Sequence, residues 1–507
     1  MATKAEILII DMGSQYTRVI ERVLRDHQYR SAVLSPDKAS GWMEHHGAKA
    51  VIISGGDKSV YDEDAPQIPQ NILDANVPIL GICYGMQWLA KHFGGTVERV
   101  QDQTGYGGTQ IELGGCDLFL NIDKDTPLTV WASHGDSVTK LPEGALVTST
   151  STEGGGIKSM VIPEHQVWGV QFHPEVKHTE DGEQMLLNFV DGICHCTEDW
   201  SETNMVKDIR DACNDPQMRV ISGFSGGVDS TTSTAIIAPK LGDRLRCILV
   251  DAGHLRENEV VEAKQHCVAA GSVLHVIEAE DLFFEALAGV TDAEQKRKIF
   301  GRLYHQIFLD EAEKFNATHV VQGTLATDLI ESGATGGAVI KSHHNVGHDW
   351  GDLGHFEPLK SLFKYEVRAI AVSLGLPDSV SQREPFPGPG FFIRMPGAVT
   401  KARRDILRWA TAEVQRVVYS HPDCPEISQL VPYLSGTKIV GVKGDKRVYE
   451  EMVVVRPIHT VDYMTASSPI FSPALMTAVM TAVSKHDKVV GVLFDFNTKP
   501  PRTTEAE

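Results

Sequence analysis

A cysteine flanked by glycines stands where a nucleophile could be presented to a substrate. Cys83 lies in GICYG (81–85), between an apolar run that predicts a buried strand and a pattern that predicts a helix. This is the nucleophile-elbow arrangement with cysteine in place of serine, in which a tight turn lifts the side chain above the sheet. A helix N-terminus also stabilises a thiolate. Cys83 is therefore a candidate for nucleophilic attack on a carbonyl carbon.

A base for that thiol is available at the end of another predicted strand. The sequence FHPE (172–175) supplies His173, which can take and return the proton, and Glu175, which can orient the imidazole. The loop SGG (54–56) also follows a predicted strand, and its backbone N–H groups can face a developing oxyanion. These residue types predict acyl-transfer chemistry.

A second site of a different kind is predicted from SGGVDS (225–230). It lies between a predicted strand and a predicted helix, where small residues let successive N–H groups surround an anion. The sequence contains no Gly-Lys dipeptide, so the lysine of a Walker A loop is missing. This favours attack at the α-phosphate of ATP, with release of pyrophosphate, over transfer of the γ-phosphoryl group.

Both sites need parallel strands to position them. Before a break at 194–203, apolar runs predict buried strands at residues 6–11, 49–53, 78–82 and 167–171, and a helix at 84–93. After the break, strands are predicted at 218–224, 247–251, 274–278 and 319–322. Strands that alternate with helices predict parallel sheets covered on both faces. Beyond PFPGPG (385–390), two helices (401–419, 474–484) and three strands (438–442, 448–457, 489–494) predict a smaller α+β region.

Composition limits the class of protein. The 507 residues are 42% hydrophobic and 22% charged, which is typical of a globular chain of several domains. The net charge of −20 argues against a general nucleic-acid binder. No apolar run approaches the ~18 residues of a membrane span, and residues 1–10 do not resemble a secretion signal. The eight cysteines are mostly isolated, which is typical of a reducing compartment and predicts a cytoplasmic location.

The motifs carry a family resemblance. Those of the first half, SGG (54–56), GICYGMQ (81–87), SHGD (133–136) and GVQFHPE (169–175), resemble the class I glutamine amidotransferases. SGGVDS resembles the PP-loop of ATP pyrophosphatases. With later motifs the resemblance extends to the glutamine-hydrolysing GMP synthase family over nearly the whole chain; these are KRKIFGR (296–302), QGTLATDLIES (322–332), IKSHHNVG (340–347), EPLK (357–360), PFPGPG (385–390), EISQ (426–429), GVKGDKR (441–447), VDYMTA (461–466) and NTKPP (497–501).

The resemblance implies a fold and a domain order. Residues 1–196 are expected to form a class I glutamine amidotransferase domain and residues 200–394 an ATP pyrophosphatase domain of the adenine nucleotide α-hydrolase-like type. Both are expected to be α/β domains with parallel sheets. Residues 395–507 are expected to form a smaller C-terminal α+β domain for dimerisation and XMP binding.

The resemblance also assigns residues by motif. For glutamine hydrolysis it implies a triad of Cys83, His173 and Glu175, oxyanion N–H groups from Gly56 and Tyr84, and Gln87 beside the glutamine pocket. For ATP it implies Ser225, Gly226, Gly227, Val228, Asp229, Ser230 and Asp251, with Asp229 also a Mg²⁺ ligand. For XMP it implies Arg297, Lys341, Gln429, Asp445, Lys499 and Glu505. His343 and His344 are expected in a lid over ATP rather than as metal ligands.

The implied reaction uses three small substrates. ATP, with Mg²⁺, adenylates the 2-oxygen of XMP and releases pyrophosphate; ammonia from glutamine then displaces AMP to give GMP. A homodimer is expected, with neither nucleic acid nor membrane as a partner.

Several positions depart from the family pattern. The sequence ends in TEAE (504–507) instead of a tryptophan between two glutamates, FFIR (391–394) replaces a smaller glycine-containing segment, residues 347–352 are unfamiliar, and Met12 replaces phenylalanine. Some of these lie on the acceptor side. They motivate an alternative in which the same two-site amidation acts on a related purine-like nucleotide in a specialised pathway.

Other functions fit the sequence less well. A catalytically idle regulatory paralogue is disfavoured because Cys83, His173, Glu175 and SGGVDS are intact. Asparagine synthetases use an N-terminal cysteine, whereas residue 2 is Ala2. CTP synthases need a kinase-like phosphate loop. A metal site at CHC (194–196) lacks a second half-site, so these cysteines are expected to pack at a domain boundary.

Overall fold

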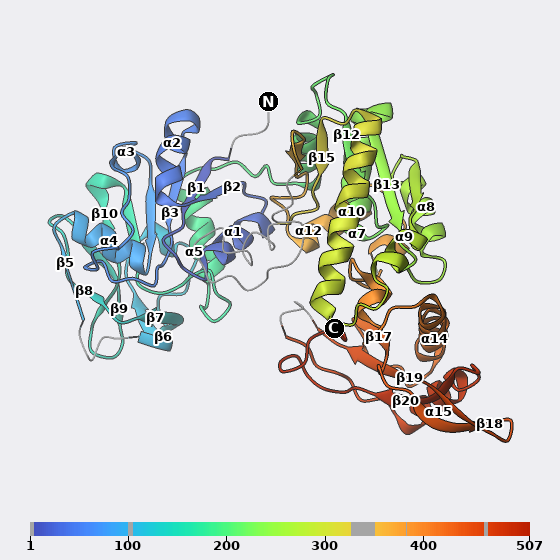
Figure 1. Cartoon of the computed structure of the whole chain (residues 1–507). Helices are drawn as coiled ribbons and strands as arrows, with labels where there is room; N and C mark the ends of the chain where they lie inside the picture. Colours follow the sequence, from blue (N-terminus) through green and yellow to red (C-terminus); the bar gives the residue numbers. More distant parts are fainter. Residues whose placement is uncertain (1–4, 100–104, 326–349, 382, 461–464) are drawn as a thin grey trace. The chain divides into compact units, whose positions relative to one another are not determined.

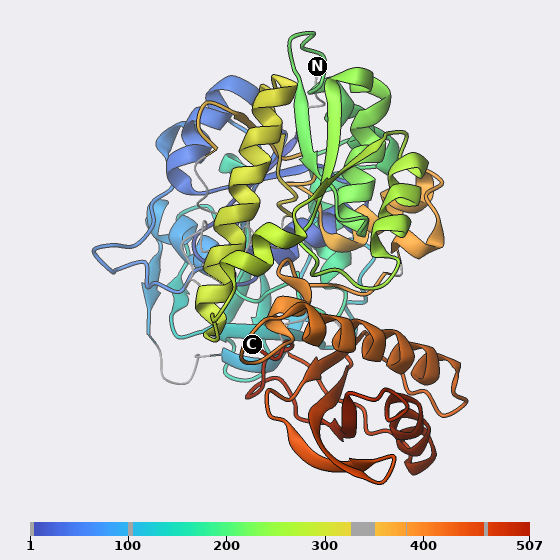
Figure 2. The same ribbon diagram turned by 45° about the vertical axis from the view of Figure 1, so that its right-hand side comes forward.

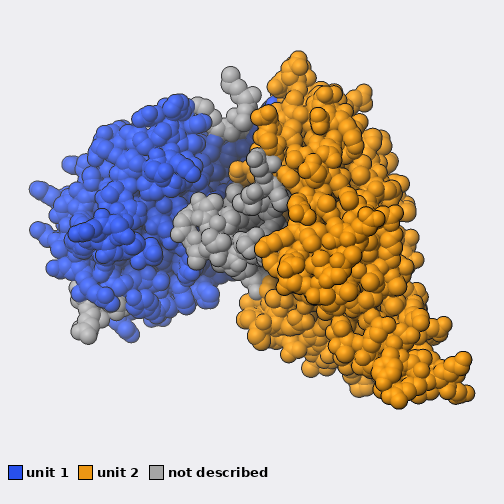
Figure 3. Space-filling view, viewed as in Figure 1, with its two compact units in different colours: residues 1–211, 327–342 blue, residues 212–326, 343–507 orange. Residues whose placement is uncertain are grey.

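A computed structural model describes residues 5–99, 105–325, 350–381, 383–460 and 465–507 (Figure 1). The chain forms two compact units (Figure 3). The described residues up to 211 belong to the first unit and those from 212 onward to the second. Of the helices in these ranges, none is both long enough and apolar enough to cross a bilayer.

The first unit is built on a mixed sheet of nine strands. Their order is β2-β1-β3-β4-β11-β10-β9-β6-β7, and the first five are parallel. Four strands of this parallel half confirm the predicted ones: Ile7–Ile10 (β1), Ala50–Ile53 (β3), Ile79–Ile82 (β4) and Val167–Val170 (β11). The fifth, Ser31–Leu34 (β2), was not predicted. The antiparallel extension comprises Gly105–Leu113 (β6), Leu128–His134 (β7), Leu146–Ser151 (β9) and Ile157–Ile162 (β10). Two short strands, Thr96–Glu98 (β5) and Ser137–Lys140 (β8), pair separately.

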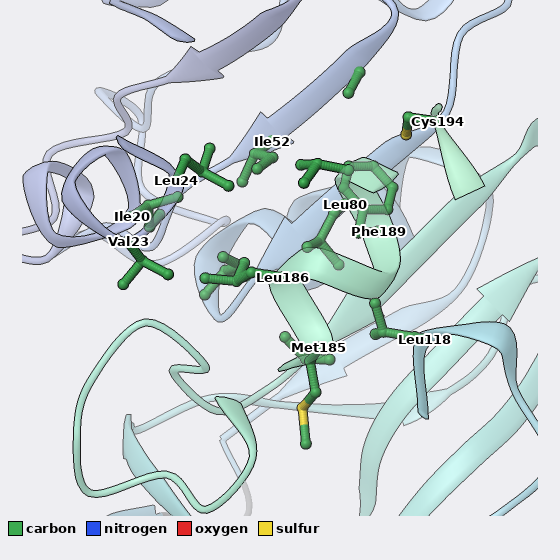
Figure 4. Close-up of a cluster of buried hydrophobic side chains, with 14 of the residues drawn as sticks. Ile20, Val23, Leu24, Ile52, Leu80, Leu118, Met185, Leu186, Phe189 and Cys194 are labelled. Carbon is green, nitrogen blue, oxygen red and sulfur yellow. The ribbon is translucent and has the colours of Figure 1, made fainter. Parts of the chain in front are cut away.

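Helices cover both faces of this sheet. Their bounds are Thr17–Asp26 (α1), Pro36–His46 (α2), Gln70–Leu73 (α3), Tyr84–His92 (α4) and Gly182–Leu187 (α5). A further helix, Glu202–Asp211 (α6), ends the unit. Side chains alternate along each strand, so Ile7 and Ile9 join one core cluster while Leu8 and Ile10 join the other. The first cluster includes Leu24 of α1, Leu186 of α5, and Cys194 (Figure 4). Burial on both faces explains why these strands are continuously apolar.

The second unit contains a parallel sheet of order β14-β13-β12-β15-β16. The strands are Val220–Gly223 (β12), Leu245–Asp251 (β13), Leu274–Glu278 (β14), His319–Val321 (β15) and Gly354–Phe356 (β16). The helices are Val228–Leu241 (α7), Glu259–Ala269 (α8), Glu280–Ala286 (α9), Ala293–Phe315 (α10), Lys364–Ser373 (α12) and Asp378–Ser381 (α13).

The strand order of this sheet reverses at β12. The chain moves outward from β12 to β14 and then returns to β15 on the other side of β12. Right-handed crossovers therefore put α7 and α8 on one face and α10 on the other. Figure 2 shows α10 running along its face, where Phe308 and Ala312 pack with Ile221 and Ile248. The crevice at such a reversal is the usual ligand site of an open α/β sheet.

The C-terminal region adds a small sheet to the same unit. Its strands are Gln429–Leu434 (β17), Ile439–Lys443 (β18), Lys446–Ile458 (β19) and Val489–Phe494 (β20), with β19 paired to the other three. Two helices, Lys401–Ser420 (α14) and Pro473–Val483 (α15), accompany them. One hydrophobic cluster joins Phe283 and Phe300 to Leu407 and Val453. Because this core is continuous, the described residues from 212 onward form one compact unit, and the boundary at 394/395 stays a prediction.

Candidate active sites

Cys83 occupies a strained turn between β4 and α4. Its φ of 52° and ψ of −104° are unusual for a residue with a side chain. A Cβ atom at Gly81 would lie 2.6 Å from the backbone carbon of Gly85, and one at Gly85 would lie 2.5 Å from the carbonyl oxygen of Ile53. Both positions therefore require glycine. The turn has the geometry of a nucleophile elbow.

His173 reaches Cys83 because β11 lies beside β4 in parallel, which brings the C-terminal ends of both strands together. The Nδ1 atom of His173 lies 2.8 Å from Oε1 of Glu175, and both side chains are buried. Burial disfavours the imidazolium, but hydrogen bonds with Cys83 and Glu175 outweigh it and raise the pKa of His173 to about 10. The imidazole of His173 thus lies between the sulfur of Cys83 and the carboxylate of Glu175, which is the arrangement of a Cys-His-Glu triad.

The remaining predicted residues of this site lie around the elbow. A Cβ atom at Gly56 would lie 3.2 Å from Cγ of Tyr84, so these two residues are in contact. The Tyr84 hydroxyl donates to the carbonyl oxygen of Pro66 at 2.9 Å, and burial raises its pKa to about 12. Gln87 donates from Nε2 to the carbonyl oxygen of Asp136 at 2.7 Å. Gly56, Tyr84 and Gln87 thus lie around the turn at Cys83, and their roles stay predictions.

Three further contacts at this site were not predicted. The Sγ atom of Cys83 lies 3.7 Å from the carbonyl oxygen of Ser133 and 3.8 Å from Nε2 of Gln171. The ring of Tyr16 packs edge-on against His173, with centroids 4.9 Å apart. Gln171 and Ser133 belong to motifs used in the prediction, so a signal for them was present; Tyr16 carries none.

The SGGVDS segment joins β12 to α7, as predicted. Gly226 has a φ of 73°, and Gly227 caps the helix in an extended conformation. The Ser225 hydroxyl accepts from the Gly227 N–H at 3.3 Å and lies 3.2 Å from the Ser230 hydroxyl. The loop and the first turn of α7, which begins at Val228, form a potential anion cradle. Asp251, at the end of neighbouring β13, accepts from the Gly253 N–H at 2.8 Å.

Two cations at this loop were missed by sequence reasoning. Lys364, the first residue of α12, places Nζ 2.6 Å from Oδ1 of Asp229. Arg383 donates to the carbonyl oxygen of Ser225 at 2.6 Å and pairs with Glu259. Both residues lie far along the chain from the loop, so no local pattern reveals them.

Asp229 fits the predicted Mg²⁺ ligand. Its carboxylate is one-third exposed at the first turn of α7, and Mg²⁺ on a nucleotide typically takes one or two carboxylates together with phosphate and water oxygens. Across the described ranges, no group of three or more His, Cys, Asp and Glu side chains is arranged to hold a metal by itself. In the CHC segment, Cys194 and Cys196 are buried in a core cluster of the first unit.

Two of the predicted acceptor residues lie together. The Gln429 amide donates to the carbonyl oxygen of Pro385 at 3.0 Å and approaches Oε1 of Glu505 at 3.4 Å. The Glu505 carboxylate also receives two hydrogen bonds of 2.7 Å from the buried guanidinium of Arg394, a residue without a predicted role. This bidentate pair fixes the carboxylate of Glu505.

The other predicted acceptor residues are more dispersed. Arg297, on α10, contacts the backbone oxygen of Glu507, and the backbone of Lys499 pairs with Ala466. Asp445 lies in the exposed turn between β18 and β19, and among the described residues no hydrogen bond or ion pair links it to Arg297, Gln429, Lys499 or Glu505. Lys341, His343 and His344 lie outside the described residues.

A cavity of about 750 Å³ lies between the contacts of the anion loop (225–230) and those of Gln429. It shares Arg383 with the anion loop and Pro385 with the partner set of Gln429. Its lining residues are Arg368, Ala369, Val372, Ser381, Arg383, Pro385, Glu426, Ile427, Ser428 and Thr460. Two guanidinium groups in such a cavity suit a phosphorylated ligand.

The departures from the family pattern are largely absorbed by packing. Phe391 and Phe392 are fully buried, and Phe392 stacks among Phe283 and Phe300. Trp350 is buried against Phe308. Met12 is also buried, and its N–H donates to the Ser54 hydroxyl at 3.0 Å. These four side chains fill cores, whereas Arg394 of the same FFIR segment contacts Glu505, a predicted acceptor residue in the altered tail.

Comparisons with known proteins cover all three regions. Three family models match: glutamine amidotransferase class-I over residues 8–193, NAD synthase over 203–388, and GMP synthase C terminal domain over 412–506. Three full-length relatives are each named GMP synthase [glutamine-hydrolyzing]. Those of Bacillus velezensis and Bacillus subtilis are 39% and 38% identical over 512 residues, and that of Thermobifida fusca is 40% identical over 526 residues. Each match covers 99% of this chain and 98% of the relative.

The matches span the mixed sheet, the anion loop and the small C-terminal sheet in the order that the sequence predicted. They confirm the fold class, two α/β domains followed by an α+β region. The chain belongs to the family of glutamine-hydrolysing GMP synthases.

Proposed function

We propose that this chain makes GMP from XMP, with ATP and glutamine as co-substrates. The observation that carries the proposal is that the triad and the anion loop are both assembled in a chain that matches GMP synthases along its whole length. The reaction is a ligation that forms a carbon–nitrogen bond at the expense of ATP.

In the first unit, Cys83 is the proposed nucleophile. Its thiolate attacks the side-chain amide carbon of glutamine, and His173, oriented by Glu175, protonates the departing ammonia. N–H groups of Gly56 and Tyr84 stabilise the oxyanion, with Gln87 at the substrate pocket. Water then hydrolyses the glutamyl thioester, which regenerates Cys83 and releases glutamate.

In the second unit, residues 225–230 are proposed to bind the phosphates of ATP, with Asp251 near the adenosine. The 2-oxygen of XMP attacks the α-phosphorus and pyrophosphate leaves; ammonia then attacks C2 and AMP leaves. Asp229 is the proposed ligand for a Mg²⁺ ion that neutralises phosphate charge when it is bound. Gln429 and Glu505, with Arg297, Lys341, Asp445 and Lys499, are the proposed contacts of XMP.

The proposed acceptor is tested by competition among nucleotides. ATP-dependent pyrophosphate release should require XMP, with ammonium as the nitrogen source, and GMP should be the product. Glu505→Gln should raise the KM for XMP about tenfold, because one charge-assisted hydrogen-bond partner is weakened by roughly 1.5 kcal/mol, while glutaminase activity stays unchanged. The matched control is Glu413→Gln, in a surface pair with Arg416 on α14. Turnover of another purine nucleotide in preference to XMP would contradict the proposal.

The proposed oligomer is a homodimer formed through the C-terminal region. Three apolar side chains on the β18–β19 hairpin support it: Val440, Val442 and Tyr449 are each more than half exposed. Sedimentation equilibrium should give twice the chain mass. A monomer at micromolar concentration would contradict this assignment.

A further inference from the structure

A buried lysine lies beside the glutaminase site. Lys158, on β10, is 5% exposed, and its Nζ atom lies 3.4 Å from Nε2 of His134. Among the ion pairs of the described residues, none includes Lys158. A buried ammonium without a carboxylate partner is costly. The buried ammonium of Lys158 therefore needs a negative charge other than a carboxylate nearby.

His134 holds this ammonium without neutralising it. Its Nδ1 atom lies 2.9 Å from the carbonyl oxygen of Asp136, which can only accept. Nδ1 therefore carries the hydrogen, and the lone pair of Nε2 accepts from Lys158. Burial and the charge of Lys158 lower the pKa of His134 to about 4, so the imidazole is neutral near pH 7.

Strand β10, which carries Lys158, is separated by β11 alone from β4, the strand that ends at Cys83. The carbonyl oxygen of Lys158 accepts from the N–H of Gln171 at 2.8 Å, and the Gln171 amide lies 3.8 Å from the Cys83 sulfur. That sulfur also lies 3.7 Å from the carbonyl oxygen of Ser133, the residue before His134. Burial lowers the pKa of Lys158, and the negative charge of Cys83 opposes this. Lys158 and Gln171 are thus neighbours across the antiparallel strands β10 and β11, which places the Lys158 side chain on the face of the sheet from which the Gln171 amide reaches the Cys83 sulfur.

We propose that Lys158 is a positioning residue of the glutaminase reaction: its ammonium, held by His134, stabilises the Cys83 thiolate as a second cation beside the His173 imidazolium. The inference rests on the proposed role of Cys83 as nucleophile. The titratable groups around the sulfur are His173, which hydrogen-bonds with it, and Glu175, which pairs with His173; Lys158 and its partner His134 follow on the neighbouring strands. When Cys83 ionises, its proton resides on His173, and Lys158 acts through its charge alone.

The test measures Cys83 alkylation by iodoacetamide as a function of pH, with the modified peptide quantified by mass spectrometry. Lys158→Met preserves length and removes the charge. The midpoint of the alkylation profile should move up by about one pH unit, so that alkylation on the acidic limb is roughly tenfold slower. The acidic limb of kcat/KM for glutamine should move in the same direction. Lys158→Arg should keep a profile close to that of the wild type.

A matched control is Lys140→Met, because Lys140 is exposed at the end of β8 in the same unit. Its profile should superimpose on that of the wild type. A folded Lys158→Met protein with an unshifted alkylation profile would overturn the inference. If this variant does not fold, Lys158→Gln, which retains a hydrogen-bond donor, replaces it, and an unshifted alkylation profile of that variant would overturn the inference. Glutaminase activity that survives complete alkylation of Cys83 would instead refute the proposed nucleophile, so the two failures are distinct.

Discussion

Replacing Cys83 with alanine is expected to abolish GMP formation from glutamine and to leave GMP formation from ammonium intact. The sulfur is the atom that would form the thioester, and its loss typically costs about 10⁴-fold or more. The second site takes ammonia without regard to its origin. Initial rates of GMP formation with either donor, at saturating XMP, ATP and Mg²⁺, measure both activities.

Cys116→Ala is the matched control, because Cys116 is a half-buried thiol in the same unit. This variant should use both donors. If Cys83→Ala still used glutamine, another nucleophile would have to be sought. If it lost both donors, the turn at Cys83 would have to influence the second site as well.

A second large effect is expected from Lys364→Met. Lys364 places its ammonium against Asp229 at the anion loop, where the phosphates of ATP are proposed to bind. Removing one preorganised cation from a site of developing phosphate charge costs roughly 10²- to 10³-fold in kcat. XMP-dependent pyrophosphate release should therefore fall by that factor, and GMP formation should fall equally with both donors. Glutaminase activity measured without XMP should be unaffected.

Lys360→Met provides the comparison. Lys360 lies four residues earlier and pairs with Glu357 at the surface, where an ion pair contributes little. Its removal should leave pyrophosphate release near the wild-type rate. An equal, small effect of both substitutions would mean that Lys364 is also only a surface partner.

The triad could be predicted because each of its residues lies in a short motif next to a recognisable strand. Glycines on both sides of Cys83 predicted a turn that the crowding at Gly81 and Gly85 now explains. The FHPE segment followed a recognisable apolar strand. Parallel strands were equally predictable, because burial on both faces makes them continuously apolar.

Residues that reach a site through tertiary packing were not predictable. Lys364 and Arg383 meet the anion loop across 135 and 158 residues of chain. Lys158 lies in a strand of mixed polarity, IKSMVI, where a lysine usually predicts a solvent-facing position. It is buried because the antiparallel part of the sheet, which the sequence did not reveal, surrounds it.

The position of β11 in the sheet also affects when the first unit can fold during synthesis. β11 is the last strand of its sheet along the chain, yet it lies in the middle, between β4 and β10. During synthesis, Cys83 leaves the ribosome about 90 residues before His173. The glutaminase site can form only when this final strand closes the sheet, a contact of high sequence separation that forms late. A nascent or truncated chain that lacks β11 would therefore be unable to consume glutamine.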